Sequence, residues 1–407
     1  SSSLPTSLRT HFTNTALIGD ASTGLSQYFL MNSDQRTAMV GEKLVNFIRG
    51  QKANEGYVAN DVAKLYRTRT HALGDIVGSQ PTYVKAPSLA YQDTGYDTFK
   101  TTNAARTPMV YVGANDGMLH AFYAPMKDTD PNYSKAGQEA WAYIPTAVMP
   151  NLYKLADANY ADKHVFYVDG TVTSADVYDA GNSKWRSIIV GGLGAGGKGY
   201  YALDVTDPTS PKSLWEFNAA AGCTTTGVGA TSDCNIGLTF GRPVVAKLKN
   251  GKWVVMVTSG YNNVEGTGAD GKGYLYVLDA STGVVIARIA TTAGDVGTPS
   301  GLREINYYVD NIAYDNTALR VYGADILGNI WRFDINDMIA PAGQDAALIG
   351  TARDAANRPQ PITTRPSLAE VRGYTFVLVG TGRLLATGDL SDTGGQTPYA
   401  IKDPMWP

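Results

Sequence analysis

Residues 109–124 read MVYVGANDGMLHAFYA. An apolar run, a glycine-containing turn and a second aromatic-rich run predict a β-hairpin. The same pattern returns four more times, as SIIVGGLGAGGKGYYALDVTDP at 187–208, WVVMVTSGYNN with GKGYLYVLDASTG at 253–283, LRVYGADILGNIWRFDIND at 319–337 and FVLVGTGRLLA at 376–386. The turns of the five units are placed at Gly113, Gly191, Gly260, Gly323 and Gly380. A self-similar unit at spacings of 57–78 residues indicates a repeat architecture.

Further strands fit on both sides of most units. Those before a unit are 79–84, 241–246 and 364–369, and those after a unit are 140–144, 213–217 and 284–289. Four strands per unit are the content of a propeller blade. The sequence therefore predicts an all-β fold, an irregular β-propeller of five to seven blades, with room for one extra blade around 165–178. A β-sandwich is the alternative, but a sandwich shows no repeat of this period.

The composition agrees with many short strands and tight turns. The chain has 407 residues, of which 44 are glycine and 25 are tyrosine, and only 17% are charged. The net charge is −3 and no basic block occurs, which argues against nucleic-acid binding. No apolar run approaches the roughly 18–20 residues that a transmembrane helix needs. The chain starts without Met and looks like a piece of something longer, so we expect any secretion signal to lie elsewhere.

Residues 1–72 differ from residues 73–407 in the spacing of their apolar residues. Apolar residues at helical spacing predict a helix over 33–49, with Ser33 as its cap and Gly50 as its stop. A weaker helix is predicted at 60–69. Since this segment cannot bury its apolar face alone, we expect it to dock on the propeller formed by residues 73–407.

The two cysteines, Cys223 and Cys234, enclose a small, polar segment rich in glycine and threonine. We predict a disulfide between them, because a flexible loop gains most from a covalent link, and this favours an oxidising compartment. Two unpaired thiols remain the alternative. A metal site is disfavoured because the spacing is not CxxC and no second pair exists.

No motif in the chain predicts catalysis. Residues 191–199 are glycine-rich, but a strand follows where a phosphate-binding loop needs a helix. The aspartates in LDVTDP at 203–208 and LDASTG at 278–283 recur once per unit, which favours a structural role in turns. GxSxG and HExxH are absent, and the chain has only four histidines.

Three stretches together resemble the C-terminal propeller of the PilC/PilY family of type IV pilus proteins. They are LGDIVGSQPTY at 73–83, VYVGANDGMLHAF at 110–122 and VYGADILGNIWRFD at 321–334, and the segments 376–386 and 396–401 fit the end of that domain. The resemblance covers about residues 36–401. It implies a modified seven-bladed propeller in a pilus biogenesis factor and tip adhesin, without enzyme activity or cofactor.

The resemblance also implies partners, location and roles. The partners would be minor pilins at the pilus tip and a host-cell or surface ligand. The location would be the outer surface of a Gram-negative bacterium, reached through the periplasm. Implied roles are pilus assembly, opposition to retraction, twitching motility and attachment. The binding residues are unknown, although the insertions 93–106, 127–139 and 218–235 are the loops most suited to binding.

Several members of the family carry a Dx[DN]xDxxxD calcium loop just before the segment that matches Val321–Asp334. In the corresponding window of this chain, only Asn311 and Asp315 fall on ligand positions, while Ala313 and Leu319 replace carboxylates. Ca²⁺ takes 6–8 oxygen ligands. We therefore predict that this degenerate calcium loop binds Ca²⁺ weakly or not at all.

A quinone-dependent (PQQ-type) dehydrogenase is the enzymatic alternative, because such propellers also have aromatic strands with Asp-x-x-x-Gly endings. Their site needs calcium and a cofactor held by carboxylates and amides, often beside adjacent cysteines. Cys223 and Cys234 are not adjacent. The tryptophans at 141, 185, 215, 253 and 331 are interpreted as packing between blades instead.

Overall fold

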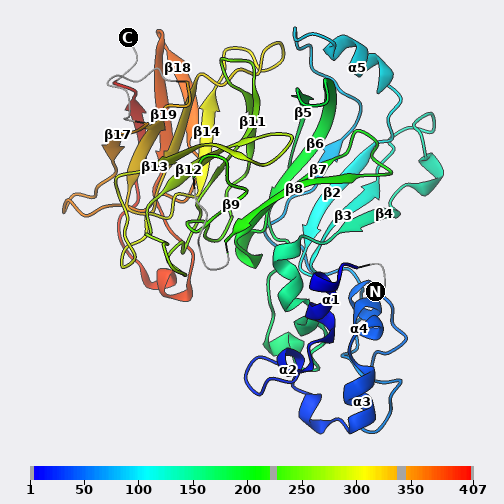
Figure 1. Ribbon diagram of the computed structural model, residues 1–407. Coiled ribbons are helices and arrows are strands. Elements are labelled where there is room, and N and C mark those ends of the chain that lie inside the picture. Colours follow the sequence, from blue (N-terminus) through cyan, green and yellow to red (C-terminus); the bar gives the residue numbers. More distant parts are fainter. Residues whose placement is uncertain (1–3, 221–226, 337–344, 405–407) are drawn as a thin grey trace.

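The computed structural model describes residues 4–220, 227–336 and 345–404, which form five β-sheets and a helical N-terminal segment (Figure 1). In every sheet the strands follow one another in chain order. Neighbouring strands are antiparallel, except for the short parallel pair β8 and β9. Each sheet is therefore built almost entirely from one local stretch of chain, as the repeat predicts.

The first two sheets come from residues 82–233. Sheet 1 contains β1 (Thr82–Val84), β2 (Met109–Ala114), β3 (Met118–Tyr123) and β4 (Glu139–Tyr143). Sheet 2 contains β5 (Thr173–Asp179), β6 (Lys184–Gly192), β7 (Gly199–Asp204), β8 (Lys212–Ala219) and β9 (Ser232–Asp233).

The other three sheets come from residues 244–402. Sheet 3 contains β10 (Val244–Lys247), β11 (Trp253–Thr258), β12 (Tyr274–Asp279) and β13 (Val285–Ala290). Sheet 4 contains β14 (Glu304–Tyr308), β15 (Arg320–Ala324), β16 (Asn329–Phe333) and β17 (Ala346–Thr351). Sheet 5 contains β18 (Ser367–Val371), β19 (Tyr374–Gly380) and β20 (Pro398–Lys402).

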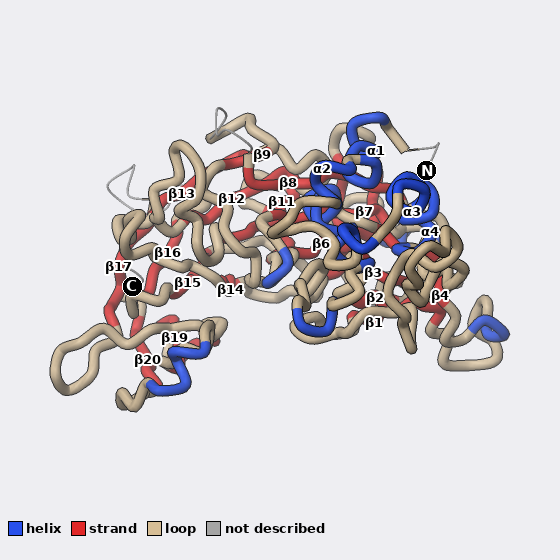
Figure 2. The backbone as a smooth tube through the Cα atoms, turned by 90° about the horizontal axis from the view of Figure 1, so that it is seen from below, coloured by secondary structure: helices blue, strands red, loops and turns tan. Residues whose placement is uncertain are grey.

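The sheets are arranged as propeller blades. Their first strands contact one another in sequence, β1 with β5, β5 with β10, β10 with β14 and β14 with β18. Figure 2 shows the sheets following an arc from β1–β4 to β19 and β20. The prediction of an all-β propeller is confirmed, with five sheets in the described residues. The prediction of an extra blade around 165–178 was wrong, because residues 173–179 form β5, the first strand of sheet 2.

The strands of the inner sheets are buried on both faces because another sheet covers each side. In β11 all six residues are buried. Alternate side chains face opposite neighbours, so that Val255 packs into the core shared with sheet 2 and Val254 into the core shared with sheet 4. This explains the continuous apolar runs that the sequence shows in place of alternation.

Two tryptophans link neighbouring sheets as predicted. The indole N–H of Trp141 on β4 donates to the carbonyl of Pro208, which follows sheet 2's β7, at 2.8 Å. The indole N–H of Trp215 on β8 donates to the carbonyl of Ala280, just after β12, at 3.0 Å. Each bond joins one blade to the next.

The repeated glycines lie mostly in strands and not in turns, which corrects the prediction. Gly113, Gly191, Gly323 and Gly380 belong to β2, β6, β15 and β19. A Cβ on Gly113 would lie 2.4 Å from the carbonyl oxygen of Val168, on the segment leading into β5. The glycine at this position permits close approach of the neighbouring segment.

The N-terminal segment holds four of the five α-helices in the described residues. They are α1 (Thr6–Thr13), α2 (Thr15–Ile18), α3 (Ser33–Ala38) and α4 (Glu42–Ile48), and α5 (Tyr96–Thr102) lies in an insertion of sheet 1. The 3-10 helices are η1 (Tyr28–Leu30), η2 (Tyr133–Lys135), η3 (Thr146–Ala156), η4 (Tyr160–Asp162), η5 (Gly194–Gly196) and η6 (Thr387–Ser391).

The structure corrects both helix predictions in this segment. The single helix over 33–49 is interrupted at Gly41, whose φ is +71°, and Asn32 caps α3 in place of Ser33. Residues 60–69 contain no helix. Backbone N–H groups of Leu65 and Tyr66 donate to the carbonyl of Asn54 instead. Long-range contacts therefore override the weak local preference.

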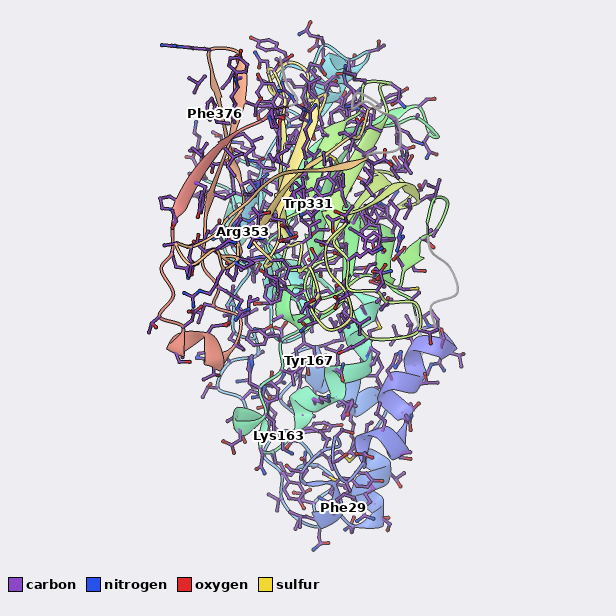
Figure 3. All side chains as sticks on the ribbon, turned by 90° about the vertical axis from the view of Figure 1, so that its left-hand side faces the viewer. Phe29, Lys163, Tyr167, Trp331, Arg353 and Phe376 are labelled. Atoms are coloured by element: carbon purple, nitrogen blue, oxygen red, sulfur yellow. The ribbon has the colours of Figure 1, made fainter. Side chains whose placement is uncertain are left out.

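α1 and α4 pack against η3, the helix between sheets 1 and 2. Their apolar side chains share a core with sheet 1, including Phe47 of α4, Leu152 of η3 and Tyr111 of β2. Figure 3 shows Phe29 at the far tip of the segment, where it is 58% exposed, whereas Trp331 lies buried among the sheets.

Candidate functional site

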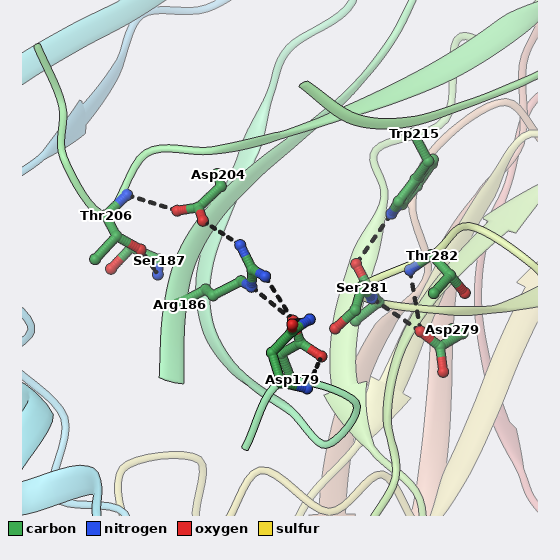
Figure 4. Close-up of polar contacts among 11 residues, drawn as sticks. Asp179, Arg186, Ser187, Asp204, Thr206, Trp215, Asp279, Ser281 and Thr282 are labelled. Carbon is green, nitrogen blue, oxygen red and sulfur yellow. Dashed lines mark hydrogen bonds and ion pairs between the residues drawn. The ribbon is translucent and has the colours of Figure 1, made fainter. Parts of the chain in front are cut away.

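The recurrent aspartates are structural, as predicted. Oδ1 of Asp279 accepts hydrogen bonds from the backbone N–H groups of Ser281 and Thr282 at 3.0 and 3.1 Å (Figure 4), and Gly283 follows with a φ of +70°. Oδ1 of Asp204 accepts from Thr206 N–H at 2.9 Å. These carboxylates close turns after the third strand of a blade.

Figure 4 also shows Arg186 between two carboxylates, those of Asp179 and Asp204. All three side chains are largely buried and come from β5, β6 and β7. The ion pairs therefore tie three strands of sheet 2 together. The glycine-rich stretch 191–199 connects β6 to β7 within the same sheet, as predicted, and is not followed by a helix.

The sequence-predicted calcium positions, Asn311 and Asp315, do lie together, in the loop of residues 309–317 between β14 and β15. The carbonyl of Asn311 accepts the backbone N–H groups of Tyr314 and Asp315 at 3.0 and 2.9 Å. The side-chain oxygen of Asn311 accepts from Ala313 N–H at 3.2 Å. Asn311 therefore closes a tight turn with its own polar groups.

Asp315 has a cationic partner, the side chain of Lys247 at the end of β10. The two charged groups lie 3.0 Å apart, and the same ammonium lies 2.7 Å from Oδ1 of Asp93. Oδ1 of Asp315 also accepts from the hydroxyl and the backbone N–H of Thr317, at 2.7 and 3.1 Å. Partial burial opposes ionisation of Asp315, but Thr317 and Lys247 outweigh it and lower the pKa of the carboxyl group.

The segment around Asp93 holds the other side of the loop. Backbone N–H groups of Ala90 and Gln92 donate to the carbonyls of Ala313 and Tyr314, at 2.8 and 3.1 Å. The carbonyl of Asn316 accepts from Lys247 N–H at 2.8 Å. The 309–317 loop is thus held between the connection from β1 to β2 and the last residue of β10.

The residues present do not fit a calcium ion. The carbonyls of Asn311, Ala313, Tyr314 and Asn316 each already accept at least one protein N–H group, and the one aspartate at a ligand position is paired with Lys247. Throughout residues 4–220, 227–336 and 345–404, no three histidine, cysteine or carboxylate side chains are grouped as metal ligands. A cation that requires 6–8 oxygens finds too few here.

Sequence reasoning missed Lys247 and Asp93. They are 154 positions apart in the chain, and neither belongs to a motif that would point to the loop. Only the radial packing of blades places the end of β10 beside the loop before β15. No local signal could have identified either residue.

A second polar cluster that sequence reasoning missed surrounds His120 on β3. Its Nδ1 lies 2.6 Å from Oε1 of Glu139, and its Nε2 lies 3.1 Å from Asp116. Burial opposes the charge on the imidazole, but Asp116 and Glu139 outweigh it and raise the pKa of His120. The cluster lines a cavity of about 410 Å³ with Arg49 and Trp141.

The predicted disulfide falls partly outside the described residues. Cys223 belongs to residues 221–226, which the structure does not describe, and Cys234 is buried. The insertion 93–106 forms α5, and Tyr96 on it packs edge-on against Trp185. The insertion 127–139 is largely exposed and contains η2. Among the helices of the described residues, none has the length and apolar character to cross a bilayer.

Comparison with known proteins gives a consistent result. A family model described as the PilY1 beta-propeller domain matches residues 73–405. The type IV pilus biogenesis factor PilY1 of Pseudomonas aeruginosa strain PAK is 36% identical over 395 residues, which cover 89% of this chain and 31% of the relative. A PilY1 homolog of Xylella fastidiosa strain Temecula1 is 34% identical, covering 90% of this chain and 27% of the relative.

Among solved structures, the crystal structure of the Pseudomonas aeruginosa PilY1 C-terminal domain is similar. It superposes with a TM-score of 0.58 at 31% identity, and the match covers 79% of this chain and 64% of that one. The chain therefore spans less than a third of the length of these two curated relatives.

Proposed function

Since this chain belongs to the PilY1 β-propeller family, we propose that it is a non-enzymatic binding module of a type IV pilus biogenesis factor. The observation that carries the proposal is the family match over residues 73–405, together with relatives that are named as pilus biogenesis factors. The resemblance found in the sequence is thereby confirmed at the level of the family.

The proposed mode of action is docking by loops on a rigid frame. Five sheets packed face to face fix the strands, and the connections between them carry the variable surface. Insertions of this kind are 93–106 and 127–139. We propose minor pilins at the pilus tip as one class of partner, and a host-cell or surface ligand as another.

The proposed location is the bacterial cell surface, at the pilus tip. We further propose that the module supports pilus assembly, opposes retraction and contributes to twitching motility and attachment. The non-enzymatic assignment is supported by the recurrent aspartates, such as Asp279 and Asp204, whose carboxylates accept backbone N–H groups in turns.

Complementation tests the proposal. The gene for the full-length protein is deleted in its own host, and strains are complemented with the intact gene or with one lacking the codons for residues 73–407. We expect surface pili and twitching zones to return only with the intact gene. Equal export of both proteins, measured by immunoblot of surface fractions, is the control. Full piliation by the shortened protein would contradict the proposal.

Two further measurements separate the classes of function. We expect the purified chain to retain minor pilins in a pull-down and to show no quinone absorbance. Dye-linked dehydrogenase activity would favour an enzyme instead. Adhesion to cells or to abiotic surfaces, compared between the two complemented strains, tests the attachment role separately.

A further inference from the structure

We infer that Lys247 serves as the built-in cation of the 309–317 loop, in place of a metal ion. The loop then holds its shape without any divalent cation. This inference concerns the loop itself and goes beyond the proposed pilus role, so either can fail without the other.

The position of the ammonium supports this assignment. Nζ of Lys247 lies 2.7 Å from Oδ1 of Asp93 and 3.0 Å from Oδ1 of Asp315, and the lysine side chain is only 13% exposed. Two carboxylates that converge on one point repel each other unless a positive charge lies between them. The ammonium supplies that charge and donates to both oxygens.

The backbone of the same lysine also forms hydrogen bonds with the loop. Lys247 N–H donates to the carbonyl of Asn316, and the carbonyl of Lys247 accepts from Ala318 N–H, both at 2.8 Å. The loop strand and the end of β10 therefore run side by side as a short parallel pairing at Thr317. One residue fixes both the course of the loop and its charge balance.

The arrangement joins three parts of the molecule that are distant in sequence. Asp93 comes from the insertion of sheet 1, Lys247 from sheet 3 and Asp315 from the connection within sheet 4. With these contacts in place, the apex of the loop presents Ile312 and Tyr314, which are 49% and 51% exposed. On this inference, the exposed position of these two side chains depends on the contacts of Lys247 and not on a bound ion.

Hydrogen–deuterium exchange of the whole chain tests the inference. In the wild-type protein we expect the same exchange rates for residues 311–317 in calcium chloride and in EDTA. In Lys247→Met, which keeps most of the unbranched side chain and removes the charge, we expect exchange in this segment to be at least tenfold faster. Lys249→Met, which removes an exposed lysine two positions away, is the matched control and should leave the loop unchanged.

A second variant separates charge from packing. Adding Asp93→Asn to Lys247→Met removes one of the two like charges, so we expect part of the loop's protection to return. If Lys247→Met fails to fold, Asp315→Asn replaces it, and loop exchange faster than in wild type is again expected.

Three outcomes would overturn the inference. The first is unchanged exchange in Lys247→Met, or in Asp315→Asn if that variant replaces it, because packing alone would then hold the loop. The second is wild-type protection that requires calcium. The third is no recovery in the double variant, because the ammonium would then not act by balancing the two carboxylates.

Discussion

Nδ1 of His120 lies 2.6 Å from Oε1 of Glu139, so that this contact joins the third strand of sheet 1 to its fourth. The other ring nitrogen of His120 lies 3.1 Å from Asp116, whose second oxygen accepts the backbone N–H of Gly74 at 2.8 Å. One imidazole thus connects two strands to the start of the propeller, where the helical segment meets it.

The charge of His120 predicts a pH-dependent stability. The pKa of His120 is raised in the folded chain, so protonated His120 stabilises the fold. This stabilisation is fully present below the ordinary pKa of 6.5 and is lost as pH rises through the raised pKa. We expect His120→Gln to lower the free energy of unfolding by about 2 kcal/mol at pH 5, and by less at pH 9.

Denaturant unfolding at a series of pH values measures this difference. Asp116 and Glu139 are the charged groups that act on the imidazole, and Arg49 lines the same cavity. His71→Gln, at an exposed position, is the control. A loss that stays constant from pH 5 to pH 9 would show that His120 acts by packing alone.

Calcium binding is expected to be weak or absent. Isothermal titration of the chain with Ca²⁺ should give no micromolar or tighter site, because Asp315 is paired with Lys247 and Ala313 and Leu319 stand where the family's loop has carboxylates. Micromolar affinity that disappears in Asp315→Ala would contradict this expectation.

Trp215 should contribute strongly to the packing of sheet 2 on sheet 3. Its indole N–H donates to the carbonyl of Ala280, and its side chain is only 7% exposed. We expect Trp215→Phe to cost about 1–3 kcal/mol of unfolding free energy and Trp215→Ala about 3–5 kcal/mol. Tyr133→Phe, at a position that is 50% exposed, is the control and should change stability by less than about 0.5 kcal/mol. Equal stability of Trp215→Phe and wild type would speak against the inter-blade bond.

The predicted disulfide between Cys223 and Cys234 can be tested chemically. Mass spectrometry of a non-reduced digest should identify the linked peptides, and reduction should lower the free energy of unfolding by about 3 kcal/mol. The double variant Cys223→Ser/Cys234→Ser should be insensitive to the reductant. Two thiols that react in the denatured, unreduced protein would rule out the link.

Much of the fold could be predicted because each sheet is local in the chain. Segments such as 109–124 contain two paired strands and the turn between them, so their periodicity reports the pairing directly. Blade limits were harder to predict. Residues 173–179 look like the start of a separate blade, but their partner is β6 in sheet 2.

The amino-acid sequence alone determined the repeat, the all-β architecture, the family resemblance and the turn role of aspartates such as Asp279, because all of these depend on neighbours in the chain. The contacts of Lys247 with Asp93 and Asp315 became visible only in the folded structure. The same is true of the interruption at Gly41 in the helix predicted over 33–49. The pairing of these charges depends on how blades stack around the arc. Lys247 and Asp93 are 154 positions apart, so the local pattern of the sequence carries no information about their contact.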